Sequence, residues 1–393
     1  MSEDRPRLTR RGVLVGGAGL GVGLAAGAAG ATLWGSTARP ATGAHVTDTP
    51  VSPHGTHQAG IDRPNTPQRC ALLVVLDLPS AVTRDDVRTA LASLGDAVDA
   101  CTTGGEDAAD ALPPDGPGDL TVTVGLGPRL VRLIDPALPG STDLPDFVGD
   151  ERIGIRARGG DLLLALYGSD ATALPAAARW LRDAVPTATL RWQQAGTRGP
   201  GEGTVVRNPL GYHDGVMVPR GEELAEGVWI AAGPAAGGTI AVIRRLRIDL
   251  DAFHDLPVAE RDRVIGRDRV TGAPLSGGTL HDPVDLTAKT PEGEYVVPAG
   301  AHVRAAHPTF TGSPLMLRRS YGYTNGVDAE GEPEEGLLFV SFQDDVEVFV
   351  RTQHRLDEVD DLMRFVRPTA SATFLILPGR SPRTPLGAPL FSP

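Results

Sequence analysis

Two short, separated segments carry side chains that could act together in one chemical site. Residues 211–215 read Gly-Tyr-His-Asp-Gly and place Asp214 in a glycine-flanked turn. Further along, residues 301–304 contain His302 and residues 317–319 contain Arg318. An imidazole can hold a metal, a carboxylate can move a proton, and a guanidinium can stabilise developing negative charge. With the imidazole on one side of a haem iron and the other two groups on the opposite side, this is the minimal set for splitting a peroxide.

Each of these residues also has an ordinary structural explanation. Asp214 could be no more than a turn residue in a glycine-rich corner. Chemistry alone leaves four other histidines open as metal ligands, and these are His213, His254, His281 and His307. Whether these side chains form one site therefore depends on the elements that position them.

Length and composition limit the classes of protein to consider. The chain has 393 residues, which exceeds one typical domain and favours two domains or one fused double domain. Its hydrophobic fraction of 41% suffices for a large core, and its formal net charge of -12 argues against nucleic acid or an anionic membrane surface as a partner. Cys70 and Cys101 could form a disulfide outside the cytoplasm or remain two thiols.

The N-terminus has the pattern of an export signal. Arg10 and Arg11 directly precede a charge-free stretch at 12–35 that is rich in Gly and Ala, which is typical of a twin-arginine signal. The alternative is a transmembrane anchor, since the stretch is long enough to cross a bilayer. We assign residues 1–44 to the signal and the start of a linker, and 45–67 to a flexible linker without apolar periodicity. The mature protein is then expected in the periplasm or outside the cell, or on the membrane if the signal stays uncleaved.

The segment 68–215 has the element order of a ferredoxin-like unit. Strands are predicted at 71–78, 120–124, 161–167 and 187–193. A helix follows the capping-box pattern at 83–86 and is expected to stop at Gly95, and a second amphipathic helix covers 174–185. The order strand, helix, two strands, helix, strand predicts a split βαβ fold.

A similar order recurs in 216–393. Strands are predicted at 239–248, 337–342 and 373–377, and helices at 257–265 and 344–365. The fold class is therefore α+β, with two ferredoxin-like halves packed sheet to sheet. The long stretch at 266–316 lacks periodicity, and a loop of this length in a compact domain is usually functional. We expect it to form a wall of a cofactor pocket.

Several motifs in a fixed order resemble those of the dye-decolourising (DyP-type) peroxidases. They are Asn-Pro-Leu-Gly-Tyr-His-Asp-Gly at 208–215, Ile-Gly-Arg at 265–267 with Thr-Gly-Ala-Pro-Leu at 271–275, the segments 301–304 and 317–323, and Gly-Leu-Leu-Phe at 336–339. The similarity covers roughly residues 68–379, and the number of separated motifs makes it specific. It implies a dimeric α+β barrel-like fold that binds haem b in its C-terminal half.

On the proximal side of the haem, the resemblance implies that His302 is the iron ligand. His307 is the nearest competitor, because it lies five residues further on and precedes a proline. A carboxylate should orient the other ring nitrogen of the ligand, but the sequence does not identify it. Arg304 could contact a haem propionate or form a surface ion pair.

On the distal side, Asp214 matches the acid and Arg318 the arginine of the family. An aspartate with an unperturbed pKa near ~3.9 predicts an acidic optimum. Arg319 should point away from the haem, since neighbours on an extended segment alternate faces. Leu337 and Phe339 have the spacing to shape a dry distal wall, although they could equally be core residues of a strand. Residue 320 is serine, so the distal asparagine of some subgroups is missing.

The resemblance implies an exported haem b peroxidase that reduces hydrogen peroxide through an oxoferryl intermediate. The electron donor would be an organic, dye-like or phenol-like reductant, or a metal-linked one. Expected partners are the twin-arginine export machinery, an iron- or copper-handling protein and further copies of the chain as a homo-oligomer. The alternatives are a deferrochelatase-like protein that handles haem or iron without peroxide turnover, and a non-haem binding protein. Asp214 and Arg318 favour the peroxidase, because a carrier needs only His302.

Overall fold

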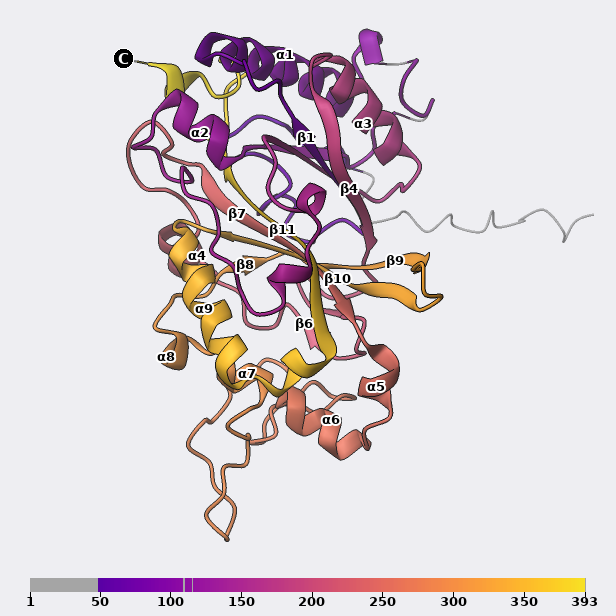
Figure 1. The fold of residues 1–393 in the computed structure, drawn as a ribbon, viewed down its shortest axis with the longest axis vertical. Helices are drawn as coiled ribbons and strands as arrows, with labels where there is room; N and C mark the ends of the chain where they lie inside the picture. The colour runs from indigo at the N-terminus through magenta and orange to yellow at the C-terminus, as the bar shows by residue number, and fades with distance from the viewer. Residues whose placement is uncertain (1–48, 109, 115, 393) are drawn as a thin grey trace, which may run out of the picture. The chain divides into compact units, whose positions relative to one another are not determined.

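The computed structural model describes residues 49–108, 110–114 and 116–392 (Figure 1). The predicted export signal at 1–44 lies outside these residues. Within the described part of the chain, none of the helices combines the length and the apolar character that a membrane crossing requires.

The N-terminal half contains the predicted strands and helices. Its elements are β1 (Cys70–Asp77), α1 (Arg84–Thr103), β2 (Thr121–Leu126), α2 (Pro128–Ile134), β3 (Leu162–Gly168), α3 (Ala173–Asp183) and β4 (Thr189–Thr197). The capping box is present, since Thr83 Oγ1 accepts the Asp86 amide at 3.2 Å and Asp86 Oδ2 accepts the Thr83 amide at 2.9 Å. The expected stop at Gly95 is wrong, because α1 continues to Thr103 and ends at Gly104 with φ 73°. Gly95 instead permits close packing, as a Cβ there would lie 3.1 Å from Cβ of Leu386.

The C-terminal half is larger and holds more irregular chain. Its elements are β5 (Val206–Arg207), β6 (His213–Asp214), α4 (Glu222–Gly227), β7 (Thr239–Ile248), α5 (Leu250–His254), α6 (Val258–Ile265), α7 (His302–Ala305), α8 (Pro308–Thr311), β8 (Leu317–Arg318), β9 (Tyr321–Val327), β10 (Pro333–Gln343), α9 (Val346–Val359) and β11 (Val366–Ile376). Figure 1 shows α1 and α3 of the N-terminal half at one end of the folded chain, with α6, α7 and α9 of the C-terminal half toward the other end. The irregular stretch expected at 266–316 has no helix or strand only up to residue 301, because α7 and α8 lie within its last part.

Nine of the strands form one closed sheet from two antiparallel sets, and β5 and β6 pair separately. The order is β7-β11-β2-β3-β1-β4-β9-β10-β8, and an additional β7–β10 pairing closes it. The joins between the halves are narrow. One is the single pair Thr197↔Gly322 between β4 and β9, and the other is two pairs between β11 and β2. The first half contributes the four strands β2-β3-β1-β4, and the second half contributes β7, β8, β9, β10 and β11. This arrangement confirms two ferredoxin-like halves.

Both faces of the central strands are buried. In β1, Leu72, Val74 and Leu76 belong to one apolar cluster, which includes residues of α1 and α3. Leu73 and Val75 face a second cluster, enclosed by strands of both halves. Because side chains alternate along a strand, burial on both faces explains the continuous apolar run that marked β1 in the sequence.

The segment expected to be a flexible linker, 45–67, is anchored to the folded unit at its centre, where residues 58–61 are buried. The Gln58 side chain donates from Nε2 to the carbonyls of Val124 at 2.8 Å and Leu377 at 2.9 Å, and accepts the Val124 amide at 2.9 Å. The His57 ring stacks on Trp229 with 3.6 Å between centroids. Residues 49–67 are therefore a strap held by side-chain contacts, which hydrophobic periodicity does not detect. Cys70 and Cys101 are free thiols.

Candidate functional site

A large cavity in the C-terminal half brings the predicted site residues together. Its empty volume is about 1680 Å³, including the part open to solvent. His302, Asp214 and Arg318 all line it. Most of the wall is apolar and includes Leu246, Ile248, Ile265, Met316, Leu337, Phe339, Phe349, Leu356 and Val366. Leu337 and Phe339 are thus placed at the cavity as expected, and α7 at the end of the long loop supplies His302.

His302 is oriented by a carboxylate that the sequence did not reveal. Its Nδ1 lies 2.6 Å from Oδ2 of Asp360, whose side chain is fully shielded from solvent. Asp360 also accepts the Leu362 amide at 2.9 Å, which fixes the carboxylate at the start of the turn Asp361–Phe365. Burial works against protonation of His302, but the charge and hydrogen bond of Asp360 outweigh it and raise the His302 pKa. With Nδ1 donating to Asp360, the lone pair of Nε2 is free to bind a metal.

His307 also lines the cavity, but its hydrogen bonding differs. Its Nδ1 accepts the Thr309 amide at 3.2 Å, and burial lowers its pKa. A neutral imidazole whose Nδ1 is an acceptor carries its proton on Nε2, which leaves that nitrogen without a lone pair for iron. His302 is therefore the better ligand of the two. His254 and His281 are exposed and do not line this cavity.

The second part of the site is the pair formed by Asp214 and Arg318. Arg318 Nη2 lies 3.6 Å from Asp214 Oδ1, and each side chain is 25% exposed. Asp214 is held by the β5–β6 ladder, where it pairs with Val206, and Oδ1 accepts the Gly215 amide at 2.6 Å. Arg318 is held by β8, where it pairs with Ser341 of β10.

Glycine is required next to Asp214. Gly215 has φ 79°, and a Cβ at this position would lie 2.2 Å from the carbonyl oxygen of Thr204. The Thr204 hydroxyl in turn donates to the Gly215 carbonyl at 2.8 Å. The glycine-flanked turn of the sequence is therefore a close backbone crossing that fixes where the Asp214 side chain begins.

Arg319 points away from this pair. It is 1% exposed, donates from Nη1 to the Ile61 carbonyl at 2.9 Å, and lies 4.9 Å from the centroid of the Tyr167 ring. The predicted alternation of Arg318 and Arg319 is thus confirmed. The Ile61 contact also ties the N-terminal strap to the strand that carries Arg318.

Arg304 does not line the cavity, contrary to the expectation that it could contact a propionate. Its guanidinium donates to the backbone carbonyls of Val297 at 3.1 Å and Leu286, and it lies 4.3 Å from the centroid of the Tyr295 ring. These contacts hold the long loop against α7, so Arg304 has a structural role. The arginines that do line the cavity, besides Arg318, are Arg244 and Arg267.

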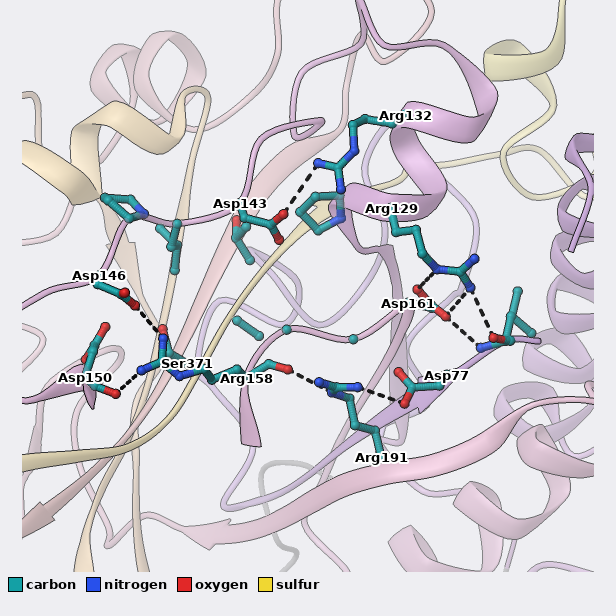
Figure 2. A pocket seen from close by; sticks show the side chains of 18 of the residues that line it. Asp77, Arg129, Arg132, Asp143, Asp146, Asp150, Arg158, Asp161, Arg191 and Ser371 are labelled. Carbon is teal, nitrogen blue, oxygen red and sulfur yellow. Dashed lines mark hydrogen bonds and ion pairs between the residues drawn. The ribbon is translucent and has the colours of Figure 1, made fainter. Parts of the chain in front are cut away.

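A separate polar cavity lies beside β1, α2 and the loop before β3 (Figure 2). Arg129 pairs with Asp161 at 2.6 Å, Arg191 with Asp77 at 2.9 Å, and Arg158 with Asp146. No histidine is found among the residues that line it. Because its guanidinium groups already have carboxylate partners and its lining includes no histidine, this cavity is not suited to bind haem iron.

Known proteins with similar sequences include members of one family of peroxidases. Residues 58–198 match the family "Dyp-type peroxidase, N-terminal" and residues 206–381 match "Dyp-type peroxidase, C-terminal". A dye-decolorizing peroxidase of Thermobifida fusca is 37% identical over 286 residues, which are 68% of this chain and 66% of that protein. A deferrochelatase of Yersinia pestis is 30% identical over 361 residues, covering 83% of this chain and 81% of that protein.

Solved structures give the same result at the level of the fold. An oxyferrous complex of DtpA from Streptomyces lividans has a TM-score of 0.82 and 32% identity, covering 88% of this chain and 98% of that one. A DyP-type peroxidase from Cellulomonas bogoriensis has a TM-score of 0.81 and 34% identity, with 88% and 99% covered. The resemblance seen in the motifs, the α+β fold class and the haem cofactor are confirmed. The chain belongs to the Dyp-type peroxidase family of haem enzymes.

Proposed function

We propose that this haem peroxidase binds haem b through His302 and reduces hydrogen peroxide with Asp214 and Arg318 on the open side of the iron. The observation that carries the proposal is that one cavity contains both a histidine oriented by a buried carboxylate and a separate carboxylate–guanidinium pair. A protein that only carries haem needs the histidine but not the pair.

The residues of the cavity fit haem. The apolar wall suits the porphyrin ring, Nε2 of His302 is available to iron, and buried Arg267 offers a positive charge for a carboxylate. When bound, haem supplies the redox-active iron that exchanges electrons with peroxide and the donor. Leu337 and Phe339 would limit the access of water and thereby strengthen the electrostatic effect of the nearby charges.

Asp214 and Arg318 have different roles in breaking the peroxide O–O bond. The Asp214 carboxylate accepts the proton of one peroxide oxygen and returns it to the other, so that the departing oxygen leaves as water. The Arg318 guanidinium stabilises negative charge on that departing oxygen. Their separation of 3.6 Å exceeds a hydrogen bond, which leaves acceptor and donor atoms available to peroxide.

After reducing peroxide, the site requires electrons from a donor. We propose an organic reductant of the dye or phenol class, or a metal-linked donor. Relatives named deferrochelatase make iron removal from haem the second candidate. The Asp214–Arg318 pair favours the peroxidase, since removal of iron does not call for proton transfer between two peroxide oxygens.

One reconstitution experiment separates these functions. Purified protein is loaded with haem and mixed with hydrogen peroxide and a phenol or an anthraquinone dye, while porphyrin products are followed by chromatography. Peroxide-dependent oxidation of the donor with intact haem is the expected result. Release of metal-free porphyrin without oxidation of the donor would support the deferrochelatase and contradict the proposal.

A matched pair of variants tests the ligand assignment. His302→Ala should abolish the Soret band of the loaded protein, whereas His307→Ala should keep it. Loss of the band in His307→Ala alone would reverse the assignment. Because both histidines line the same cavity, the comparison controls for disturbance of the wall.

We further propose that the protein is exported by the twin-arginine machinery and acts in the periplasm or outside the cell. Arg10 and Arg11, directly before the charge-free stretch, support this proposal. Replacing both arginines with lysine should keep the protein in the cytoplasm, as measured by cell fractionation, and normal export of this variant would contradict it. We also propose that the protein forms a homo-oligomer and has an iron- or copper-handling partner. Light scattering of the mature protein tests the homo-oligomer.

A further inference from the structure

Arg267 is a buried cation for which the described residues supply no counterion. Its side chain lines the large cavity and is 4% exposed. Nη1 donates to the carbonyls of Gly272 at 2.8 Å and Leu280 at 3.0 Å. Nη2 is buried and has no hydrogen-bond partner within the described part of the chain. Burial lowers the pKa of Arg267, as expected for a charge that lacks a compensating carboxylate.

The other two arginines of the cavity differ from Arg267 in this respect. Arg244 Nη2 lies 2.6 Å from Asp150 Oδ1, and Arg318 pairs with Asp214. The carboxylates nearest to Arg267 in sequence have partners elsewhere. Asp262 Oδ1 accepts the Tyr212 hydroxyl at 2.6 Å, and Asp268 Oδ1 accepts the Thr271 amide and hydroxyl at 2.6 Å. Among the described residues, the unsatisfied positive charge of the cavity is therefore that of Arg267.

The backbone places Arg267 beside the helix that begins at His302. The preceding residue, Gly266, has φ 92°, and a Cβ there would lie 2.3 Å from Cγ2 of Val303 and 3.2 Å from Cβ of Ala301. Only a glycine allows the chain to pass this close to α7. Arg267 therefore enters the cavity from the same wall as His302.

Its neighbour His213 does not provide the missing charge. The His213 ring packs against Gly272, where a Cβ would lie 2.6 Å from its Nδ1. Burial, together with the charges of Arg207 and Arg267, lowers the pKa of His213. An imidazole is either neutral or positively charged, so His213 cannot be the counterion of Arg267.

We propose that Arg267 binds one carboxylate of haem through its guanidinium and thereby sets the orientation of the porphyrin over His302. This inference rests on the proposed function, since it assumes that haem occupies the cavity. An N–H of a guanidinium that donates to a carboxylate forms a strong charge-assisted hydrogen bond. Arg267, rather than Arg304, would then contact the haem carboxylate.

The test compares haem with haem dimethyl ester, in which both carboxylates are neutralised. Haem-free protein is titrated with each porphyrin, and the ratio of the two dissociation constants is determined for wild type, Arg267→Gln and Arg269→Gln. We expect Arg267→Gln to lower the preference for haem by about 10- to 100-fold, the ratio that one charge-assisted hydrogen bond gives. Affinity for the ester should remain within about threefold, since it does not use the charge.

Arg269→Gln is the matched control. Arg269 is an exposed arginine of the same segment, does not line the cavity, and contributes the same net charge. The preference of Arg269→Gln for haem over the ester should equal that of wild type. Circular dichroism of the haem-free proteins checks that each variant is folded. If Arg267→Gln does not fold, Arg267→Lys serves instead, with a several-fold smaller preference expected because one ammonium group cannot replace all the donors of the guanidinium.

The outcomes separate this inference from the proposed function. If wild type binds neither porphyrin, the proposed function fails. If wild type binds haem and a folded Arg267 variant keeps the full preference over the ester, the inference fails alone. An unchanged preference with a raised KM for a carboxylate-bearing dye, but not for a neutral phenol, would also overturn it and assign the anion to the donor.

Discussion

The Nδ1 atom of His302 lies 2.6 Å from Oδ2 of Asp360, a carboxylate that solvent does not reach. This contact determines the tautomer of the ring, and therefore which nitrogen faces a metal. It also distinguishes His302 from His307, whose Nδ1 accepts a backbone amide instead. The choice of ligand thus follows from hydrogen bonding that the sequence motif alone does not specify.

Replacement of Asp360 should weaken haem binding without removing the ligand. In Asp360→Asn the side-chain oxygen can still accept the Leu362 amide, but the negative charge beside His302 is lost. We expect haem affinity to fall by about 10- to 100-fold, as for other partners of ligating histidines. Titration of the haem-free variant measures this, and an affinity equal to wild type would show that Asp360 does not support the ligand.

Gly215→Ala should disturb Asp214 through the backbone. The new Cβ would meet the Thr204 carbonyl at 2.2 Å in addition to the strain of φ 79°. Gly331→Ala is the control, because Gly331 has φ 89° but no atom within 4 Å of the corresponding Cβ. The control should lose about 1–3 kcal/mol of unfolding free energy from backbone strain alone, and Gly215→Ala should lose more. Equal losses in urea unfolding would exclude a clash at Gly215.

The ion pair between Asp150 and Arg244 should be important for stability. Both side chains are 2% exposed, and Asp150→Asn would leave the Arg244 charge buried without its partner. Loss of about 3–5 kcal/mol of unfolding free energy is expected. Asp143→Asn provides the comparison, because its pair with Arg132 is exposed and exposed pairs contribute about 1 kcal/mol or less. Similar effects of the two substitutions on urea unfolding would contradict this account.

Much of the fold follows from local patterns. The alternating and apolar runs of β1, β3, β7 and β11, together with the Thr83 capping box, are each specified within a few residues. Features set by tertiary contact could not be predicted in this way. Gly95 resembles a helix stop but serves close packing against Leu386, and the strap at 49–67 is held by the Gln58 side chain rather than by an apolar stripe.

In the site, too, local motifs predict some residues, while others are set by tertiary contacts. The motifs identified His302, Asp214 and Arg318, and the structure places all three at one cavity. Asp360 lies 58 residues from His302 in the chain, so no local spacing signals their contact. The same holds for Arg304, because only the folded chain shows that its guanidinium donates to backbone carbonyls and that the residue lies outside the cavity lining.

We propose that Asp214 and Arg318 act on peroxide while His302 holds the haem. The most direct test is the second-order rate constant for the spectral change when hydrogen peroxide is mixed with haem-loaded protein in a stopped-flow instrument. For Asp214→Asn we predict a fall of about 10²- to 10⁴-fold, and for Arg318→Leu about 10²- to 10³-fold, with haem content equal to wild type. Wild-type rate constants in both variants at full haem content would contradict the claim.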